Sequence, residues 1–194
     1  MKTTLLAYLT THLDLEEAEV AGILKDYPVR NVEKGQFLLR PGEICRHAFF
    51  VEQGLLRQYS IDGKGKEHIL MFGPENWFVT DRESTYFNQP SAYFIQAYED
   101  SRVILLDEDF VRRVSARYPD YIQFNNRLLH NHIRHLQRRI NLLLSATAKE
   151  RYMHFMDVYP DILSRVPQAM VASYLGMTPE SLSRVRRRIA ERGG

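Results

Sequence analysis

The chain has 194 residues, of which 44% are hydrophobic and 26% charged, with a single cysteine and a formal net charge of +2. This length suits one large domain or two small ones, and the composition is that of a globular protein rather than a disordered one. A lone cysteine excludes an internal disulfide, a cysteine zinc knuckle and a four-cysteine iron–sulfur cluster. No apolar run is long enough to span a membrane and the N-terminus is a poor signal peptide, so we expect a cytoplasmic protein.

Charge is distributed unevenly along the chain. Residues 1–126 contain 14 Lys and Arg against 19 Asp and Glu, a net charge of −5, whereas residues 127–194 contain 12 against 5, a net charge of +7. A basic C-terminal part behind a mildly acidic front suggests that only the back of the chain meets a polyanion. Chance and ordinary surface solvation can also produce such an uneven charge distribution, so the asymmetry alone does not decide the function.

The first hundred residues predict a short helix followed by many short strands. Residues 13–27 place apolar side chains among carboxylates, and Asp14 is suited to cap an amphipathic helix there. From Val29 to Asp107, β-branched and aromatic runs alternate with glycines, and the Asp-Gly pair at 62–63 predicts a hairpin turn. Many short strands at nearly regular spacing predict an antiparallel sandwich or barrel.

After the opening Pro119, the segment to about Leu144 contains neither glycine nor proline and has helical periodicity. Its apolar positions follow alternating four- and three-residue steps, with Asn at one a position, β-branched residues at the others and mostly Leu at d. This split predicts a parallel two-stranded coiled coil, in which the single Asn fixes register. The alternative is one amphipathic helix packed on its own domain. The expected dimer interface consists of Ile122, Asn126, Leu129, Ile133, Leu136, Ile140 and Leu143.

Three histidines lie in the same segment, at positions 130, 132 and 135. Their spacing does not put all three on one helical face, so we expect no metal site there. His130 and His132 occupy e and g positions beside the seam, where protonation near pH 6 would weaken dimerisation. The role of His135 is left open by the sequence.

The last fifty residues predict a helix-turn-helix. The sequence TAKE at 147–150 fits a capping box, Pro167 and Gly176 bracket a short helix, and Thr178 followed by Pro179 marks the start of another. The two final helices have facing apolar residues, which is the packing that a helix-turn-helix needs. Glu180, Ser181 and Arg184 stay on outward-facing arcs, where such groups pair with base edges. An ordinary helical hairpin with a solvated face is the alternative.

With these motifs in place, nearly the whole chain resembles the Crp/Fnr family of bacterial transcription regulators. The resemblance rests on the glycine pattern KGQFLLRPGE…FFVEQGLLRQY…DGKGKEHIL, on the long helix and, most specifically, on VASYLGMTPESLSRVRRRI. It implies an α+β protein with a jelly-roll-like β-roll sensor domain (1–118), a dimerisation helix (119–144) and a helix-turn-helix domain (145–194). No wing is evident after the last helix, where that family usually adds a β-hairpin.

Carried over by position, the family's base-contacting places fall on Glu180, Ser181 and Arg184. Pro179 stands where some relatives have an arginine, so one common base contact is absent. Without a wing, we expect phosphate contacts from four residues whose side chains donate hydrogen bonds or carry positive charge. These are Thr178, Arg186, Arg187 and Arg188.

The resemblance also locates an effector pocket, but with altered chemistry. Relatives that bind cyclic nucleotides use a Gly-Glu pair and an Arg-Ser pair, and the matching positions here are Val79–Thr80 and Pro90–Ser91. Loss of the arginine leaves a cyclic phosphate without its charge-assisted partner, so we do not expect cyclic AMP or cyclic GMP to bind. The candidate lining residues are Arg82, Ser91, Thr80 and Tyr59.

The sequence therefore predicts a homodimeric, sequence-specific DNA-binding transcription regulator that is not an enzyme. Its expected partners are double-stranded DNA and a second copy of itself, with RNA polymerase and an unidentified small-molecule effector as further candidates; we expect no cofactor, no bound metal and no membrane contact. A cupin-like metal-dependent β-barrel enzyme is one alternative, although the only His-x-His pair, at 130 and 132, lies outside the strands. A β-roll interaction module without DNA binding is the other.

Overall fold

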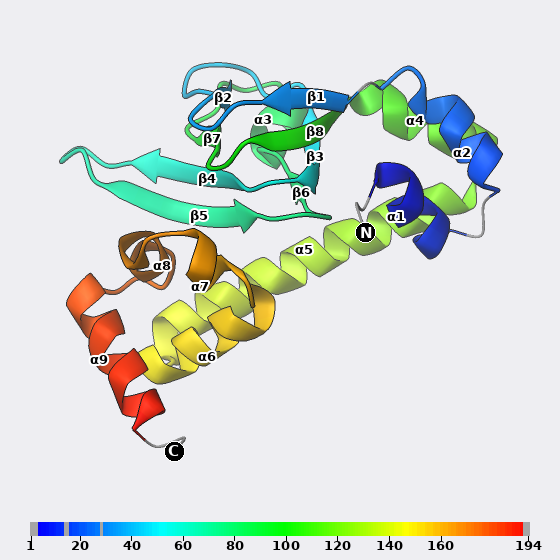
Figure 1. Cartoon of the computed structure of the whole chain (residues 1–194). Helices are drawn as coiled ribbons and strands as arrows, with labels where there is room; N and C mark the ends of the chain where they lie inside the picture. The colour runs from blue at the N-terminus through cyan, green and yellow to red at the C-terminus, as the bar shows by residue number, and fades with distance from the viewer. Residues whose placement is uncertain (1–3, 14–15, 28, 192–194) are drawn as a thin grey trace. The chain divides into compact units, whose positions relative to one another are not determined.

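A computed structural model describes residues 4–13, 16–27 and 29–191 of the chain (Figure 1). The described residues form two compact units. The first, which we call the β unit, comprises residues up to 61 together with 70–128; the second, the helical unit, comprises 62–69 and 129–191. The long helix α5 (Asp120–Ser145) contributes to both.

The β unit contains two four-stranded sheets, ordered β1-β8-β3-β6 and β2-β7-β4-β5. The strand pairs with a defined register are antiparallel, as in β3–β8 and β4–β7. This arrangement confirms the predicted α+β class with an antiparallel β-roll. The strands are β1 (Val29–Val32), β2 (Phe37–Leu39), β3 (Ala48–Gln53), β4 (Leu56–Ile61), β5 (Glu67–Gly73), β6 (Phe78–Val79), β7 (Phe94–Ala97) and β8 (Ser101–Leu106).

Successive side chains along each strand point to opposite faces of the sheet, so one core forms between the two sheets and a second forms outside them. Phe49 and Val51 of β3 face the other sheet, whereas Phe50 between them faces the helices. Val103 and Ile104 of β8 divide in the same way. Because both faces of these strands are covered, their sequences are continuous apolar runs rather than alternating ones.

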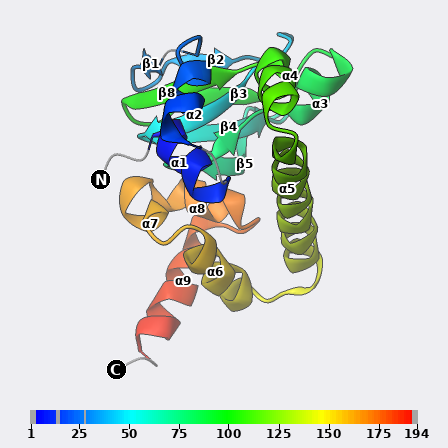
Figure 2. The ribbon, with the colours of Figure 1, turned by 90° about the vertical axis from the view of Figure 1, so that its right-hand side faces the viewer.

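The outer core is formed with helices from both ends of the β unit. They are α1 (Leu5–His12), α2 (Glu17–Leu24) and α4 (Glu108–Arg117), together with the first turns of α5; α1 and α2 lie next to each other in Figure 2. Short helix α3 (Arg82–Phe87) completes the unit. Helix α1, capped by Thr4, lies outside the predicted helix, and the expected cap Asp14 lies outside the described residues.

The helical unit places four helices after α5. They are α6 (Ala148–Val158), α7 (Ile162–Arg165), α8 (Gln168–Tyr174) and α9 (Pro179–Ala190). The predicted capping box is present, since Thr147 Oγ1 accepts from Glu150 N and the Glu150 carboxylate accepts from Thr147 N. Phe155, Tyr159 and Tyr174 form the aromatic centre, with ring centroids 5.3–5.5 Å apart. The predicted boundaries at 118 and 144 do not coincide with the division between the two units, and the predicted roles of the three segments stay predictions.

Candidate nucleic-acid interface

Helices α8 and α9 are joined by a turn whose hydrogen bonds fix its shape. Gly176 has φ +62°, its N–H donates to the carbonyl of Ser173 and the N–H of Met177 donates to that of Ala172. This pair of bonds is the Schellman arrangement, which favours glycine at the left-handed position. The turn therefore sets the direction in which α9 leaves α8.

The first turn of α9 is capped as the sequence predicts. Thr178 Oγ1 accepts from Ser181 N at 3.2 Å, and Pro179 occupies the first helical position. The pKa of Glu180 lies below its usual value because its carboxylate accepts from its own backbone N–H and from Thr178, with the charge of Arg184 adding to the effect. Glu180 is therefore ionised at neutral pH and is available as a hydrogen-bond acceptor on an exposed surface.

One face of α9 is buried and the opposite face is open. Leu182 is completely buried against the neighbouring helices, and Val185 and Ile189 are half-buried on the same side. Glu180, Ser183, Arg184 and Arg187 are exposed and follow the i, i+3, i+4, i+7 spacing of a single helical face. We call these four residues the open face of α9.

Ser181, one of the three expected base-contacting residues, is half-buried and lies beside the open face rather than in it. Its hydroxyl accepts from Arg184 Nη2 at 3.1 Å and is 3.2 Å from Thr178 Oγ1. Ser181 thus orients the Arg184 guanidinium, while the hydroxyl on the open face belongs to Ser183. Sequence reasoning missed Ser183, although the three-residue step from Glu180 is visible in the sequence.

Of the arginines expected at phosphates, Arg187 and Arg188 are exposed and Arg186 is half-buried. Arg187 Nε lies 3.8 Å from the Glu191 carboxylate, an exposed ion pair that costs little to break. An arginine side chain is long and flexible, so each of these three can extend from α9 in more than one direction. Their contacts with phosphate stay a prediction, as does that of the exposed Thr178.

Helix α5 presents an unpaired apolar stripe at the predicted seam. Ile122, Ile133, Leu136, Ile140 and Leu143 are 40–56% exposed, Asn126 is exposed and Leu129 is half-buried. The residues that α5 buries in the β unit, Tyr121 and Phe124, are not seam positions and face another direction. The stripe is a large exposed apolar surface of the kind that marks a protein–protein interface.

Asp81 occupies the region of the β unit where the resemblance places an effector phosphate. It is buried and caps α3, accepting from Ser84 N, and its second carboxylate oxygen accepts from the Ser91 hydroxyl at 2.7 Å. Ser91 N donates in turn to the carbonyl of Glu43. A protein carboxylate therefore holds the donors that an incoming anion would need, and Pro90 next to it adds none. These residues do not fit a cyclic phosphate.

The other expected pocket residues lie in different surroundings. The Thr80 hydroxyl is 3.2 Å from the carbonyl of His47 and 3.1 Å from Thr85 Oγ1. Tyr59 is buried between the Phe94 ring, stacked at 4.9 Å, and the Arg57 guanidinium, 4.2 Å from its ring centroid. Arg82 is exposed on α3. The Ser91 side chain therefore contacts Asp81, whereas the Thr80 and Tyr59 side chains each have partners of their own.

Besides the three histidines of α5, the helical unit contains His154 on α6, which sequence reasoning did not consider. His130 is exposed and His132 half-buried, whereas His135 lies with Nε2 3.5 Å from the Tyr174 hydroxyl. Burial lowers the pKa of His135, and the positive charges of Arg139 and Arg138, with those of His132 and His154 whenever these are protonated, lower it further; burial also lowers the pKa of His154. Among the described residues, no three His, Cys, Asp or Glu side chains are grouped as a metal site would require.

Residues 29–118 match the family model described as the cyclic nucleotide-binding domain. The chain is 28% identical over 165 residues to the fumarate and nitrate reduction regulatory protein of Vibrio cholerae, covering 79% of this chain and 65% of that protein. It is also 28% identical over 173 residues to the anaerobic regulatory protein of Pasteurella multocida, covering 84% of this chain and 63% of the relative. The match thus spans less than two thirds of either relative.

Solved structures share the fold. A CooA mutant from Carboxydothermus hydrogenoformans superposes with a TM-score of 0.73 at 21% identity, covering 100% of this chain and 87% of the other. FixK2 from Bradyrhizobium japonicum gives a TM-score of 0.72 at 18% identity, with 86% of each chain covered. These matches confirm the resemblance and the architecture expected from the sequence.

Proposed function

We propose that this chain, which resembles regulators of the Crp/Fnr family in sequence and fold, is a DNA-binding transcription regulator that acts as a homodimer. The observation that carries the proposal is the open face of α9. Its ionised Glu180, the Ser183 hydroxyl and the Arg184 guanidinium stand on a helix fixed by a Schellman turn and a buried leucine. A second helix held in this way, with its N-terminal half exposed, is what major-groove recognition requires.

Three of the four side chains on the open face suit base edges, and the fourth, Arg187, is assigned to phosphate. Arg184 has the planar fork that pairs with guanine N7 and O6, and the Glu180 carboxylate accepts from cytosine N4. Ser183 suits either donor or acceptor atoms. Ser181 is assigned the positioning of Arg184, while Thr178, Arg186, Arg187 and Arg188 supply phosphate contacts that fix register without specifying sequence.

The α5 stripe supports dimerisation through a parallel coiled coil. Its isoleucines and leucines at a and d would bury against their copies, and Asn126 would set the register. In such a dimer the two recognition helices address successive major grooves, so half-sites about 34 Å apart are expected on a roughly palindromic operator. RNA polymerase is a further partner of a regulator of this type.

The β-roll is proposed to sense a small molecule other than a cyclic nucleotide, or to act as a scaffold. Asp81 already holds Ser84 N and Ser91 Oγ, so a cyclic phosphate would bring a second negative charge against a buried carboxylate. Cyclic AMP or cyclic GMP at about 100 times a micromolar Kd would raise the free energy of unfolding by about 2.7 kcal/mol. We expect neither nucleotide to shift the unfolding midpoint.

Two matched protein variants, each measured on operator and on random duplex DNA, test the role of the open face. Arg184→Ala should weaken binding to a selected operator by about 1–3 kcal/mol and relax the preference at one base pair per half-site. Arg187→Ala, a turn further along, should weaken operator and random duplex alike and reduce the salt slope by about one unit. Equal losses on both duplexes for Arg184→Ala would contradict its assignment as a base-contacting residue.

No enzymatic activity is proposed for the chain. A metal-dependent β-barrel enzyme would retain stoichiometric metal after purification. An interaction module without DNA binding would retard no duplex in a gel shift with genomic fragments. None of the described helices is long and apolar enough to cross a bilayer.

A further inference from the structure

The strand β5 is at the edge of its sheet, next to β4 only. The backbone N–H and C=O groups on the outer side of an edge strand have no strand partner and need other groups to bond them. In the first half of β5 these groups include the carbonyl of Glu67 and both the N–H and the carbonyl of Ile69. The turn before it, from Asp62, is tied by bonds to the Asp62 carboxylate from the N–H groups of Lys64 and Lys66.

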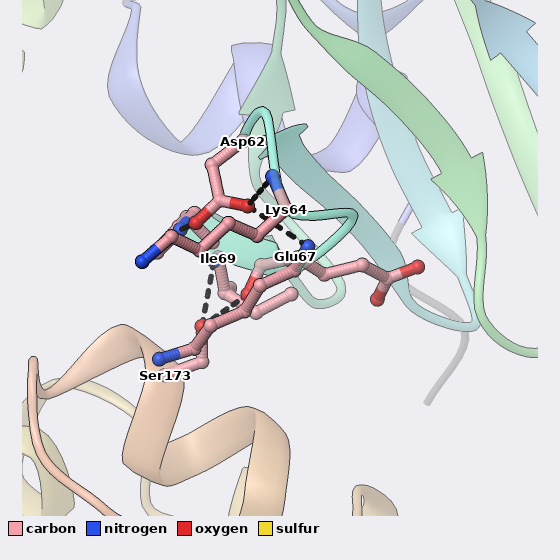
Figure 3. A network of polar contacts seen from close by, with 7 residues as sticks. Asp62, Lys64, Glu67, Ile69 and Ser173 are labelled. Atoms are coloured by element: carbon pink, nitrogen blue, oxygen red, sulfur yellow. Dashed lines mark hydrogen bonds and ion pairs between the residues drawn. The ribbon is translucent and has the colours of Figure 1, made fainter.

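Ser173 of α8 bonds two of these edge groups with one hydroxyl. Ile69 N donates to Ser173 Oγ at 3.0 Å, and Ser173 Oγ donates to the carbonyl of Glu67 at 3.1 Å, as Figure 3 shows. A serine hydroxyl carries one donor and two acceptor lone pairs, so it serves an N–H and a C=O together. The side chain thus acts as a short substitute for a neighbouring strand.

Arg139 of α5 bonds the third group. Its Nη2 donates to the carbonyl of Ile69 and to the carbonyl of Tyr174, each at 3.0 Å, and its guanidinium lies 4.0 Å from the centroid of the Tyr174 ring. One guanidinium therefore joins the hairpin tip to the last residue of α8. We call the bonds made by Ser173 and Arg139 to Glu67 and Ile69 the hairpin contact.

The hairpin contact lies within the helical unit, because residues 62–69 group with residues 129–191. It fixes α8, and α8 fixes α9 through the Schellman turn and the buried Leu182. The open face of α9 nevertheless stays exposed, since Glu180, Ser183 and Arg184 are all solvent-accessible with the contact formed. The contact holds the recognition helix without covering the surface that would meet DNA.

We propose that the hairpin contact positions the recognition helix, and that Ser173 and Arg139 are positioning residues for DNA reading. The inference rests on the proposed function. Residues 62–69, which the chain joins to the β unit at both ends, hold α8 through the hydrogen bonds of Ser173 and Arg139. If the contact is lost, α8 and α9 occupy the reading orientation for a smaller fraction of time. The apparent Kd rises by the inverse of that fraction.

Ser173→Ala in the full-length dimer tests the proposal, with Ser173→Thr as the conservative variant and Ser164→Ala as the control. Ser164 is an exposed serine of α7 that bonds only within its own turn, to the carbonyl of Asp161. We expect Ser173→Ala to weaken operator binding about tenfold, a reduction of the competent fraction to about one tenth. The preferred sequence and the salt slope should not change, because no base or phosphate contact is removed. Ser173→Thr should restore most of the affinity, and Ser164→Ala should match the wild type.

Amide hydrogen exchange at Ile69 reports the contact independently of DNA. The Ile69 N–H should be protected in the wild type and in Ser173→Thr, and should exchange faster in Ser173→Ala. Unchanged exchange in Ser173→Ala would show that the contact does not form and would overturn the proposal. Faster exchange with unchanged operator affinity would overturn the positioning role. If the wild type selects no DNA at all, the proposed function fails and the positioning role fails with it, while the exchange result still stands.

Discussion

Replacing Asp81 with alanine removes two buried hydrogen bonds from the β unit at once. The carboxylate caps α3 through Ser84 N and accepts from Ser91 Oγ at 2.7 Å. Loss of an N-cap costs about 1 kcal/mol, and loss of a hydrogen bond to a charged group costs about 1.5–3 kcal/mol. Ser91 keeps bonds to the N–H and carbonyl of Tyr93, so the lower part of that range applies. We expect the free energy of unfolding to fall by about 2–3 kcal/mol.

Urea unfolding of Asp81→Ala, Ser91→Ala and the double variant measures this directly. Because the two side chains bond each other, the double-mutant cycle should give a coupling energy of about 1 kcal/mol or more. Asp109→Ala is the control, since Asp109 is an exposed partner of Arg112 whose loss should cost under about 0.5 kcal/mol. A loss as small as the control's for Asp81→Ala, or additive single variants, would refute the view that this carboxylate takes the place of a ligand anion.

Three further predictions concern the helices. Ile133→Asp and Ile140→Asp should convert the dimer to monomer in sedimentation experiments, whereas Asn131→Asp at the outer f position should not, and a dimer that survives both seam changes would exclude the coiled coil. Gly176→Ala should destabilise the helical unit by about 1–2 kcal/mol, because alanine is disfavoured at φ +62° and its Cβ would lie 2.9 Å from Leu143 Cδ2; an unchanged urea midpoint would argue against this turn. Since the pKa values of His135 and His154 are lowered on folding, their contribution is present above the unfolded pKa near 6.5 and is lost as pH falls below it, so the helical unit should be less stable at pH 5.5 than at 7.5. Replacing both by Gln should flatten that dependence and His130→Gln should not; a profile unaffected by the double change would show that these histidines are not its source.

Local signals in the sequence predict most of the helical part. The capping box at Thr147, the glycine at 176 and the cap at Thr178 each depend on residues within a few positions of one another, and each is where the sequence places it. The strand region is predicted in kind, because strand propensity and glycine spacing are also local. The α1 helix is missed because its eight residues carry little periodicity and are stabilised by burial of Leu5 and Leu9 in the β unit.

What the sequence does not predict depends on side-chain contacts that the folded structure creates. The bond from Ser91 to Asp81 and the bonds from Ser173 to β5 join positions whose pairing no local pattern indicates, the latter across more than a hundred residues. The different exposure of Ser181 and Ser183 has a more local cause, and the predicted base contact of Ser181 stays a prediction. Both serines follow the cap, and only the hydrogen bond from Arg184 to Ser181 shows which hydroxyl is engaged within the helix.

Selection of binding sites from a random duplex library is the most direct test of the central claim that α9 reads DNA. The wild type should enrich a roughly palindromic sequence whose half-sites lie one helical turn apart, about 34 Å. The Arg184→Ala protein should enrich the same spacing but lose the preference at one base pair in each half-site. Failure of the wild type to enrich any sequence, or an unchanged preference in Arg184→Ala, would contradict the account.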